Sequence, residues 1–399
     1  MAPESSTATL PLPQKAGAIT FATIFVIESF ARSLNVTVVS LQAYDILGSS
    51  QKVSVLATLV SLTLLLLTLM LPFVLGRLRR RWAYSLGALL LIIASLALAT
   101  HTLTGQAIGM FLRNGGSAMF HIVLSLYILD NIKRQDLARV EPIRLSASAV
   151  SWTVGPGLGV WLYVEYGSWG TQAAVIASLI VLLAVFWYLR LSDSGSSLPS
   201  GTLQPFNPLA NVCRFIKQPR LVLAWLIAFG RSCFWATFMI YGPLLIVESG
   251  LGKGMSGLVI SASQALLLAA YWSGTLARRF GVRSVLAGSF CLGSVTALGA
   301  GIAGTEAPYL AIGFLLMGAL AGSALDGVGG IPFLRAVRPH ERQRMTAVYR
   351  TSIEFSELIP SFIFAFALLW FEIGVVFVIL GLWLGVMSFL TWRYLPRSL

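Results

Sequence analysis

Charged side chains are scarce in this sequence. Asp, Glu, Lys and Arg make up 11% of the 399 residues, whereas hydrophobic residues make up 57%. A soluble domain carries about 25% charged residues, so this chain has too few polar groups to cover a globule in water. The same composition excludes intrinsic disorder, which requires low hydrophobicity and high charge. A membrane protein with many spans fits, because its lipid-facing surface is as apolar as its core.

Cysteine and catalytic motifs are also scarce. The three cysteines are Cys213, Cys233 and Cys291, an odd number without metal-ligand spacing, so neither a disulfide framework nor a metal site is predicted. No cofactor is expected. The glycine-rich string 250–254 contains a lysine but lacks the spacing of a P-loop, and no hydrolase, zinc-protease or kinase motif occurs. These absences argue against an ATP-driven pump and against an enzyme.

Long apolar segments dominate what is present. A helix needs roughly 20 residues to cross about 30 Å of hydrocarbon, and twelve segments of this kind occur. Helices are predicted, because backbone groups in lipid must be satisfied within each segment. The polar stretch 1–15 lacks the features of a signal peptide, so the first span is expected to be retained. The predicted spans are 17–42, 54–75, 82–100, 104–130, 145–166, 169–189, 220–247, 255–276, 284–303, 307–334, 346–370 and 373–394.

The basic residues lie in alternate connections. The odd-numbered connections contain only Lys52 and Lys253, whereas the even-numbered ones hold clusters such as residues 77–81, 133–144, 278–283 and 335–344. Cytoplasmic loops of membrane proteins carry such an excess of Lys and Arg. We therefore predict a multi-pass protein of the cell (inner or plasma) membrane with both termini in the cytoplasm. Because the basic excess is explained by topology, its net charge of +13 does not indicate a nucleic-acid partner.

The chain divides into two similar halves. A stretch rich in Ser, Gly and Pro, residues 191–218, is typical of a flexible linker. Residues 30–33, Phe-Ala-Arg-Ser, parallel residues 229–232, Phe-Gly-Arg-Ser, and Arg-Leu-Ser-Ala at 144–147 parallels Arg-Met-Thr-Ala at 344–347. A near-constant offset predicts duplication of a six-helix unit. The predicted domains are an N-terminal bundle, 1–190, a cytoplasmic linker, 191–218, and a C-terminal bundle, 219–399.

In this organisation the sequence resembles the major facilitator superfamily (MFS) of secondary transporters. The loops after the second and eighth spans resemble the family's loop signature, with Arg80 and Arg278 standing where the family carries Asp. The fifth span carries the Gly-Pro-x-x-Gly pattern found in exporters of the family, although small residues at a close helix crossing explain the same pattern. The residues that match these two motifs are Gly76, Arg80, Arg81, Gly274, Arg278, Arg279, Gly155, Pro156 and Gly159. The resemblance implies an all-α fold of twelve transmembrane helices in two pseudo-symmetric six-helix bundles, with helices 1, 4, 7 and 10 around a central cavity.

Charges inside the predicted spans mark candidate sites, because a charge at mid-bilayer costs at least about 2.5–3.5 kcal/mol on insertion scales. Arg32 and Arg231 resemble the paired arginines of organophosphate carriers in the superfamily, and guanidinium groups suit a planar anion. Glu28 and Arg32, one turn apart, equally suit a static ion pair. The predicted substrate-binding residues are Arg32, Arg231, Arg113, Trp235 and Asn35. The predicted proton-coupling residues are Glu28, Asp326, Glu354 and Glu357.

These features favour a proton-coupled carrier of a small anionic metabolite that works by alternating access. One alternative is a multidrug or metabolite proton antiporter, an exporter without preference for anions, in which aromatic residues contact a cation. Another is a non-transporting member that serves as a sensor or as a lipid-surface module. The expected partners are a small-molecule substrate, protons and the lipid bilayer, and a monomer is expected. The substrate and the direction of transport stay open.

Overall fold

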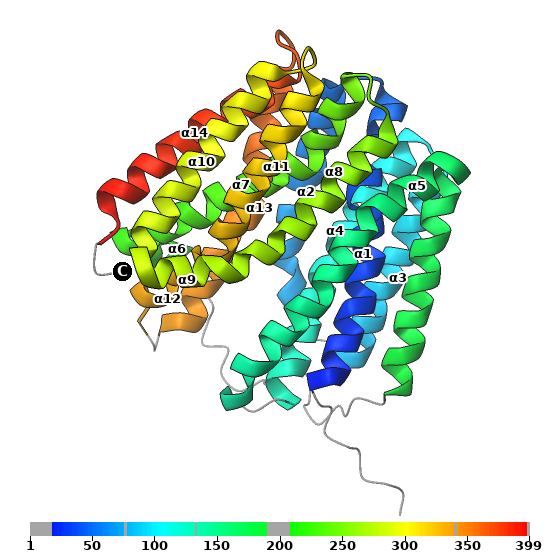
Figure 1. Ribbon diagram of the computed structural model, residues 1–399. Coiled ribbons are helices and arrows are strands. Elements are labelled where there is room, and N and C mark those ends of the chain that lie inside the picture. The colour runs from blue at the N-terminus through cyan, green and yellow to red at the C-terminus, as the bar shows by residue number, and fades with distance from the viewer. Residues whose placement is uncertain (1–17, 76–77, 132–133, 190–207, 339–340, 397–399) are drawn as a thin grey trace, which may run out of the picture.

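The computed structural model describes residues 18–75, 78–131, 134–189, 208–338 and 341–396, and every regular element among them is helical. Figure 1 shows the helices running side by side in two groups. The N-terminal half contains α1 (Ala18–Leu47), α2 (Ser50–Leu75), α3 (Arg80–Ala99), α4 (Leu103–Asn131) and α5 (Arg134–Tyr188). The C-terminal half contains α6 (Pro208–Ile216), α7 (Pro219–Glu248), α8 (Lys253–Leu266), α9 (Ala270–Phe280), α10 (Val282–Ala303), α11 (Pro308–Val328), α12 (Ile331–Ala336), α13 (Arg342–Ala367) and α14 (Gly374–Tyr394).

The predicted spans correspond to these helices once the breaks are included. α5 contains two of them, separated at Gly167, whose φ of 68° only glycine adopts freely. The eighth span is the bent pair α8 and α9, joined by a 3₁₀ turn at Leu267–Ala269. The tenth span consists of α11 and the short α12, separated by a turn at Gly329 and Gly330. The all-helical fold is confirmed.

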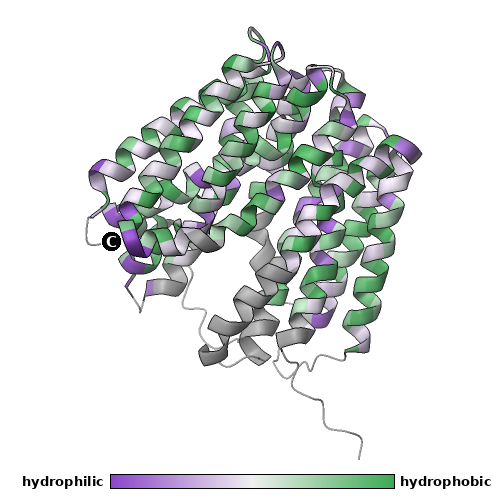
Figure 2. Ribbon diagram, viewed as in Figure 1, coloured by the Kyte–Doolittle hydropathy of each residue, from purple (hydrophilic) through white to green (hydrophobic). Residues whose placement is uncertain are grey.

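Length and composition alone identify fewer spans. Seven helices within the described ranges are long and apolar enough to cross a membrane, or eight with the bent pair α8–α9. This number is lower than twelve partly because α5, which contains two predicted spans, is counted once, as Ser148–Tyr188. In addition, the described apolar part of α2, Ser50–Leu65, is too short to be counted. Figure 2 shows hydrophobic residues along most of the helices. Large apolar side chains such as Trp161, Trp370 and Phe389 are exposed, as a lipid-facing surface requires.

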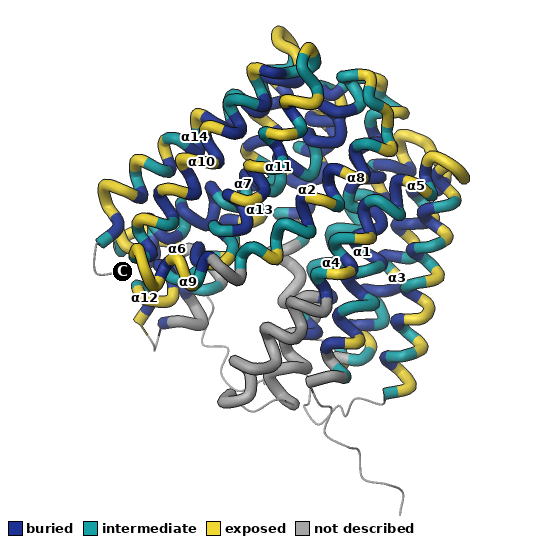
Figure 3. Tube along the Cα trace, in the orientation of Figure 1, coloured by how far each residue is buried: buried dark blue, intermediate teal, exposed yellow. Residues whose placement is uncertain are grey.

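Each half has its own apolar core. In the N-terminal half, Leu34, Tyr84, Phe120 and Leu179 are fully buried together. The larger core belongs mainly to the C-terminal half and extends to a few residues of α1 and α2, including Val53 and Val60. Figure 3 shows buried residues continuing along the inner sides of both groups. The two groups therefore meet mainly where α5 packs on α8 and α2 packs on α13, and Gly157 N donates a hydrogen bond of 2.8 Å to Ser261 Oγ across the first of these contacts.

The predicted linker is partly helical. Residues 190–207 lie outside the described residues, whereas 208–216 form α6. Phe215 is buried against Leu221 and Phe333, and Arg214 Nε lies 2.9 Å from Glu341 Oε1. This end of the predicted linker is thus fixed to the C-terminal half.

Small residues let α1 and α5 approach closely. A Cβ added at Gly155 would overlap the Ser33 side chain, and one at Gly159 would overlap the Leu34 carbonyl oxygen. Ser33 Oγ donates a hydrogen bond of 2.9 Å to the Ser151 carbonyl oxygen across the same contact. The Gly-Pro-x-x-Gly pattern therefore serves a backbone-to-backbone crossing.

We expect Gly159→Ala to destabilise the protein by about 1–3 kcal/mol, because the added methyl group has no space and the helices must separate. The measurement is the thermal unfolding temperature in detergent. Gly313→Ala is the matched control, since a Cβ there meets nothing within 4 Å. Equal unfolding temperatures for the two variants would contradict the close crossing.

Candidate substrate cavity

A cavity of about 340 Å³ lies between the two halves. Helices α1, α2 and α4 line it from the N-terminal half, and α7, α11 and α13 from the C-terminal half. Four of these, α1, α4, α7 and α11, are the helices that the family resemblance implies. The lining residues are Val36, Val39, Ser40, Ala57, Val60, Ser61, Met110, Arg113, Asn114, Arg231, Ser232, Trp235, Ala236, Met239, Ile240, Asp326, Ile353, Ser356 and Glu357.

Two of the charged lining residues form a direct ion pair. Arg231 Nη1 on α7 lies 3.3 Å from Asp326 Oδ1 on α11, and both side chains are partly exposed to the cavity. Arg231 has no acidic neighbour one turn away on its own helix, so its partner comes from a neighbouring helix. The pair lies entirely within the C-terminal half.

The other two charged lining residues face each other from opposite halves. Arg113 on α4 and Glu357 on α13 interact electrostatically, but neither has an ion-pair partner within 4 Å in the described part of the chain. Arg113 Nε is buried and has no hydrogen-bond partner there. A buried guanidinium with an unused donor is suited to receive an anionic group.

Trp235 provides a rigid aromatic wall to the cavity. Its ring packs edge-to-face on Phe234 at 5.3 Å and on Phe238 at 5.8 Å between centroids. Met110, Met239 and Ile240 add apolar surface. The cavity thus combines a charged part with an apolar part.

Arg32, Glu28 and Asn35 do not line this cavity. Arg32 Nη1 lies 3.4 Å from Glu28 Oε1, and the fully buried Glu28 also accepts a hydrogen bond of 3.4 Å from the Tyr84 hydroxyl. Asn35 exchanges two amide hydrogen bonds of 3.0 Å with Gln172 on α5. The expected sharing of one cavity by Arg32 and Arg231 is not found, because Arg32 is held within the N-terminal half.

Arg113 links this group to the cavity. It borders both the main cavity and a narrow space of about 10 Å³ shared with Arg32 and Asn35. That space is too small for a metabolite. The predicted Glu354 also does not line the main cavity, although its helix neighbours Ile353 and Glu357 do.

None of the loop-motif residues that the structure describes lines the cavity. Gly76 is outside the described residues, and the Arg80 side chain is likewise not described. Arg81 stacks over Trp187 at 6.0 Å, and Arg278 donates a hydrogen bond of 3.1 Å to Thr275 Oγ1. Arg279 lies over the ring of Phe280 at 5.3 Å, and Gly274 lies near it on α9.

Several lining residues have no signal in the sequence. Ser40, Ser61, Ser232 and Ser356 are small polar residues of a kind that occurs in every apolar helix. Asn114 was detectable in principle, because it follows directly after Arg113, a charge within a predicted span. The contribution of α2 also follows only from the packing, whereas that of α13 is indicated in the sequence by Glu357.

We expect Glu28→Gln to lower stability. It removes one partner of a buried ion pair, which typically costs about 3–5 kcal/mol, and leaves the Arg32 guanidinium without its counter-charge. The measurement is the unfolding temperature and the yield of folded protein. Glu28→Gln combined with Arg32→Gln should recover most of the loss. Normal stability together with an altered pH dependence of transport would instead support the predicted coupling role of Glu28.

Comparisons with known proteins agree with this architecture. A family model described as Major Facilitator Superfamily matches residues 21–273. The solved nucleoside transporter NupG is similar, with a TM-score of 0.75 and 13% identity over 94% of this chain and 99% of that chain. A POT family transporter in complex with 5-aminolevulinic acid gives a TM-score of 0.75 and 13% identity over 95% of this chain and 97% of that one.

A bacterial homologue of the iron transporter ferroportin, in an inward-facing state, gives a TM-score of 0.70 and 14% identity over 94% of this chain and 98% of that chain. At such low identities these likenesses establish the fold and not the substrate. A search among curated proteins gave no match. The family match spans more than half of the chain, and the helices surround a central cavity between two halves. The chain belongs to the Major Facilitator Superfamily, and it is a secondary transporter.

Proposed function

We propose that this transporter carries a small anionic metabolite together with protons, by alternating access through the cavity between the halves. The observation that carries this proposal is Arg113, a buried cavity cation with an unused donor and no ion-pair partner within 4 Å among the described residues. A carboxylate or phosphate group would supply that partner. Glu357, on the opposite wall of the cavity, would bind the co-transported proton.

The charge balance of the cavity supports coupling to protons. Within the part of the chain that the structure describes, the charged residues that line it are Arg113, Arg231, Asp326 and Glu357, and their formal charges sum to zero. Binding an anion at Arg113 leaves the Glu357 charge without compensation in a medium of low dielectric constant, where an unpaired charge is strongly disfavoured. Protonation of Glu357 removes that charge. Anion and proton therefore favour each other's binding, with a coupling free energy on the order of 1–3 kcal/mol.

A second function, proton-coupled exchange of drugs or metabolites without preference for anions, is favoured by the apolar part of the wall. Trp235 presents an aromatic face suited to cations or planar rings. Met110 and Met239 have flexible side chains that adapt to ligands of different shape. In that case Glu357 or Asp326 would exchange a proton for a cation.

Flux measurements in proteoliposomes separate the two functions. Purified protein is reconstituted with an entrapped pH-sensitive dye, and a proton gradient is imposed. The substrates are monocarboxylates, dicarboxylates and sugar phosphates, compared with nucleosides and the lipophilic cation tetraphenylphosphonium. We expect protons to enter the proteoliposomes together with the anion. Proton movement driven by the cation alone would favour the antiporter, and protein-free liposomes provide the baseline.

We also propose that both termini and the 191–218 linker face the cytoplasm, with bundles at 1–190 and 219–399. The basic clusters in the even-numbered connections support this orientation. Reporter fusions after Leu191 and at Leu399 should both give a cytoplasmic signal. A periplasmic or extracellular signal from either fusion would contradict the orientation.

A further inference from the structure

Among the described residues, several polar contacts between the halves lie at one end of the molecule, where α2 meets α7 and α1 meets α8. Ser50 Oγ donates a hydrogen bond of 2.5 Å to Glu248 Oε1. Ser54 Oγ and the Tyr241 hydroxyl lie 2.7 Å apart. Lys52 and Lys253, the lone basic residues of the odd-numbered connections, lie at this same end, opposite the basic loops.

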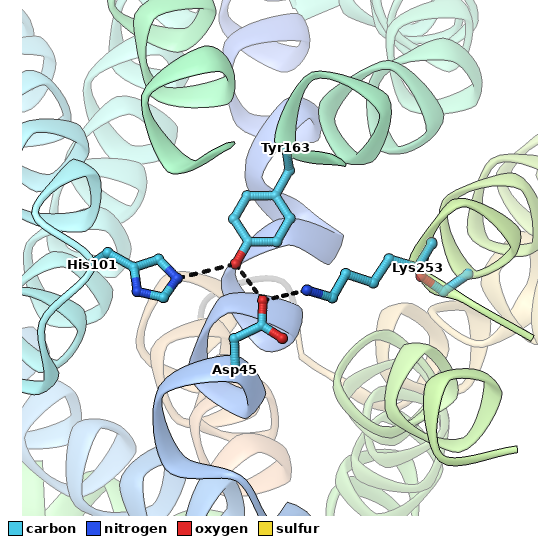
Figure 4. A network of polar contacts seen from close by, with 5 residues as sticks. Asp45, His101, Tyr163 and Lys253 are labelled. Carbon is cyan, nitrogen blue, oxygen red and sulfur yellow. Dashed lines mark hydrogen bonds and ion pairs between the residues drawn. The ribbon is translucent and has the colours of Figure 1, made fainter. Parts of the chain in front are cut away.

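The strongest of these contacts is a four-residue network, called the latch here (Figure 4). Asp45 Oδ2 on α1 accepts a hydrogen bond of 2.5 Å from the Tyr163 hydroxyl on α5 and one of 2.6 Å from Lys253 Nζ on α8. His101 Nε2, in the connection between α3 and α4, lies 3.3 Å from the Tyr163 oxygen. Three members belong to the N-terminal half, and only Lys253 belongs to the C-terminal half. The ion pair between Asp45 and Lys253 therefore bridges the two halves.

The direction of the hydrogen bonds follows from the number of protons. Tyr163 has a single hydroxyl proton, and Asp45 is the acceptor that binds it at the shorter distance. The Tyr163 oxygen must then accept from His101 Nε2, so His101 is an Nε2–H donor in this network. The His101 backbone has a φ of 52°, which is uncommon for a residue other than glycine. The chain adopts this unfavourable conformation at the residue that places the imidazole against Tyr163.

Asp45 has one negative charge, which serves both the hydrogen bond from Tyr163 and the ion pair with Lys253. His101 and Lys253 line the same small pocket of about 280 Å³, together with Tyr163. A second proton on the imidazole would place another positive charge in the N-terminal half beside Asp45. The Asp45 charge is then balanced within its own half, and Lys253 is repelled. Tyr44 interacts electrostatically with both Asp45 and Glu248, and Glu248 also accepts a hydrogen bond from Ser50.

We propose that the latch is an acid-released gate, in which protonation of His101 weakens the Asp45–Lys253 bridge and favours opening of the cavity at this end. Histidine is the side-chain type that changes charge between pH 5 and 8 in most proteins. The gate is separate from the coupling site, because none of its four members lines the cavity. It makes opening on the side of the latch sensitive to the pH of the adjoining solution, whichever substrate the cavity binds.

The test measures access to the cavity from the side of the latch. Cys213, Cys233 and Cys291 are replaced, and Ser40→Cys is introduced on the cavity wall. A membrane-impermeant thiol reagent is added to intact cells and to inside-out vesicles at pH 8.0 and pH 5.5. A second single-cysteine variant, Glu306→Cys, places the thiol in the exposed α10–α11 connection at this end. Its labelling rate corrects for the pH dependence of the thiol reaction. We expect corrected labelling from the latch side to rise at least threefold at pH 5.5.

Substitutions at His101 test the proton sensor, and substitutions at Asp45 and Lys253 test the ion pair that closes the gate. His101→Gln should label slowly at both pH values, and His101→Arg should label rapidly at both. Lys253→Asp should open the gate by repelling Asp45, and Asp45→Lys combined with Lys253→Asp should close it again. Labelling of Lys253→Asp at the wild-type rate would overturn the latch. A wild-type pH response in His101→Gln would overturn the sensor, even if the latch itself holds.

Discussion

Glu357→Gln is expected to abolish accumulation of substrate against its gradient while substrate-for-substrate exchange continues. Glutamine keeps the shape of the side chain but cannot take up or release a proton. The cavity then keeps one formal positive charge from Arg113, Arg231 and Asp326, so an anion binds without a proton. Binding and exchange persist, but the proton gradient no longer drives uptake. The measurement is uptake into proteoliposomes with an imposed proton gradient, compared with counterflow in its absence.

Two comparisons make this experiment specific. Glu306→Gln, at an exposed carboxylate in the α10–α11 connection, should accumulate substrate at the wild-type level. Glu354→Gln tests the carboxylate one turn earlier on α13, which does not line the cavity. If Glu357→Gln accumulates substrate with the wild-type pH profile, the coupling role passes to Asp326, Glu354 or Glu28.

Arg113→Gln is expected to reduce transport of anionic substrates by about 10- to 100-fold, because it removes a charge-assisted hydrogen bond worth about 1.5–3 kcal/mol. The loss should appear in the apparent affinity for the anion. Neutral or cationic compounds, if the cavity admits them, should be affected much less. Uptake of a labelled carboxylate across a range of concentrations measures the effect.

The controls for Arg113 address charge and geometry separately. Arg220→Gln removes an exposed arginine at the start of α7 and should have no effect. Arg113→Lys keeps the charge but loses the planar fork, so it should recover only part of the affinity. Undiminished anion transport by Arg113→Gln, with Arg231→Gln inactive, would move the anion site to the Arg231–Asp326 pair.

Most of the fold could be predicted from the sequence because it depends on local properties. Apolar segments of sufficient length become helices, since lipid offers no other partner for their backbone groups. Gly167 and the pair Gly329–Gly330 mark breaks that composition indicates. α6 was less predictable, because Phe215 forms part of the C-terminal core only through contacts with distant residues.

The candidate site could be predicted only in part. The sequence identifies Arg113, Arg231, Asp326 and Glu357 as costly charges within apolar spans, and all four line the cavity. Helical spacing does not tell which neighbouring helix a face contacts. Arg32 is therefore predicted on the cavity, although Glu28 and surrounding residues hold it inside the N-terminal half.

The close crossing of α1 and α5 has a mechanical consequence. At Gly159 the α5 backbone lies directly against the Leu34 carbonyl group of α1, and at Gly155 the short Ser33 side chain lies between the two helices, so a tilt of one helix displaces the other. α1 carries Asp45 near one end and Ser40 on the cavity wall, and α5 carries Tyr163. We therefore expect the two helices to move together, so that a displacement of α1 and α5 at Asp45 also shifts Ser40 on the cavity wall.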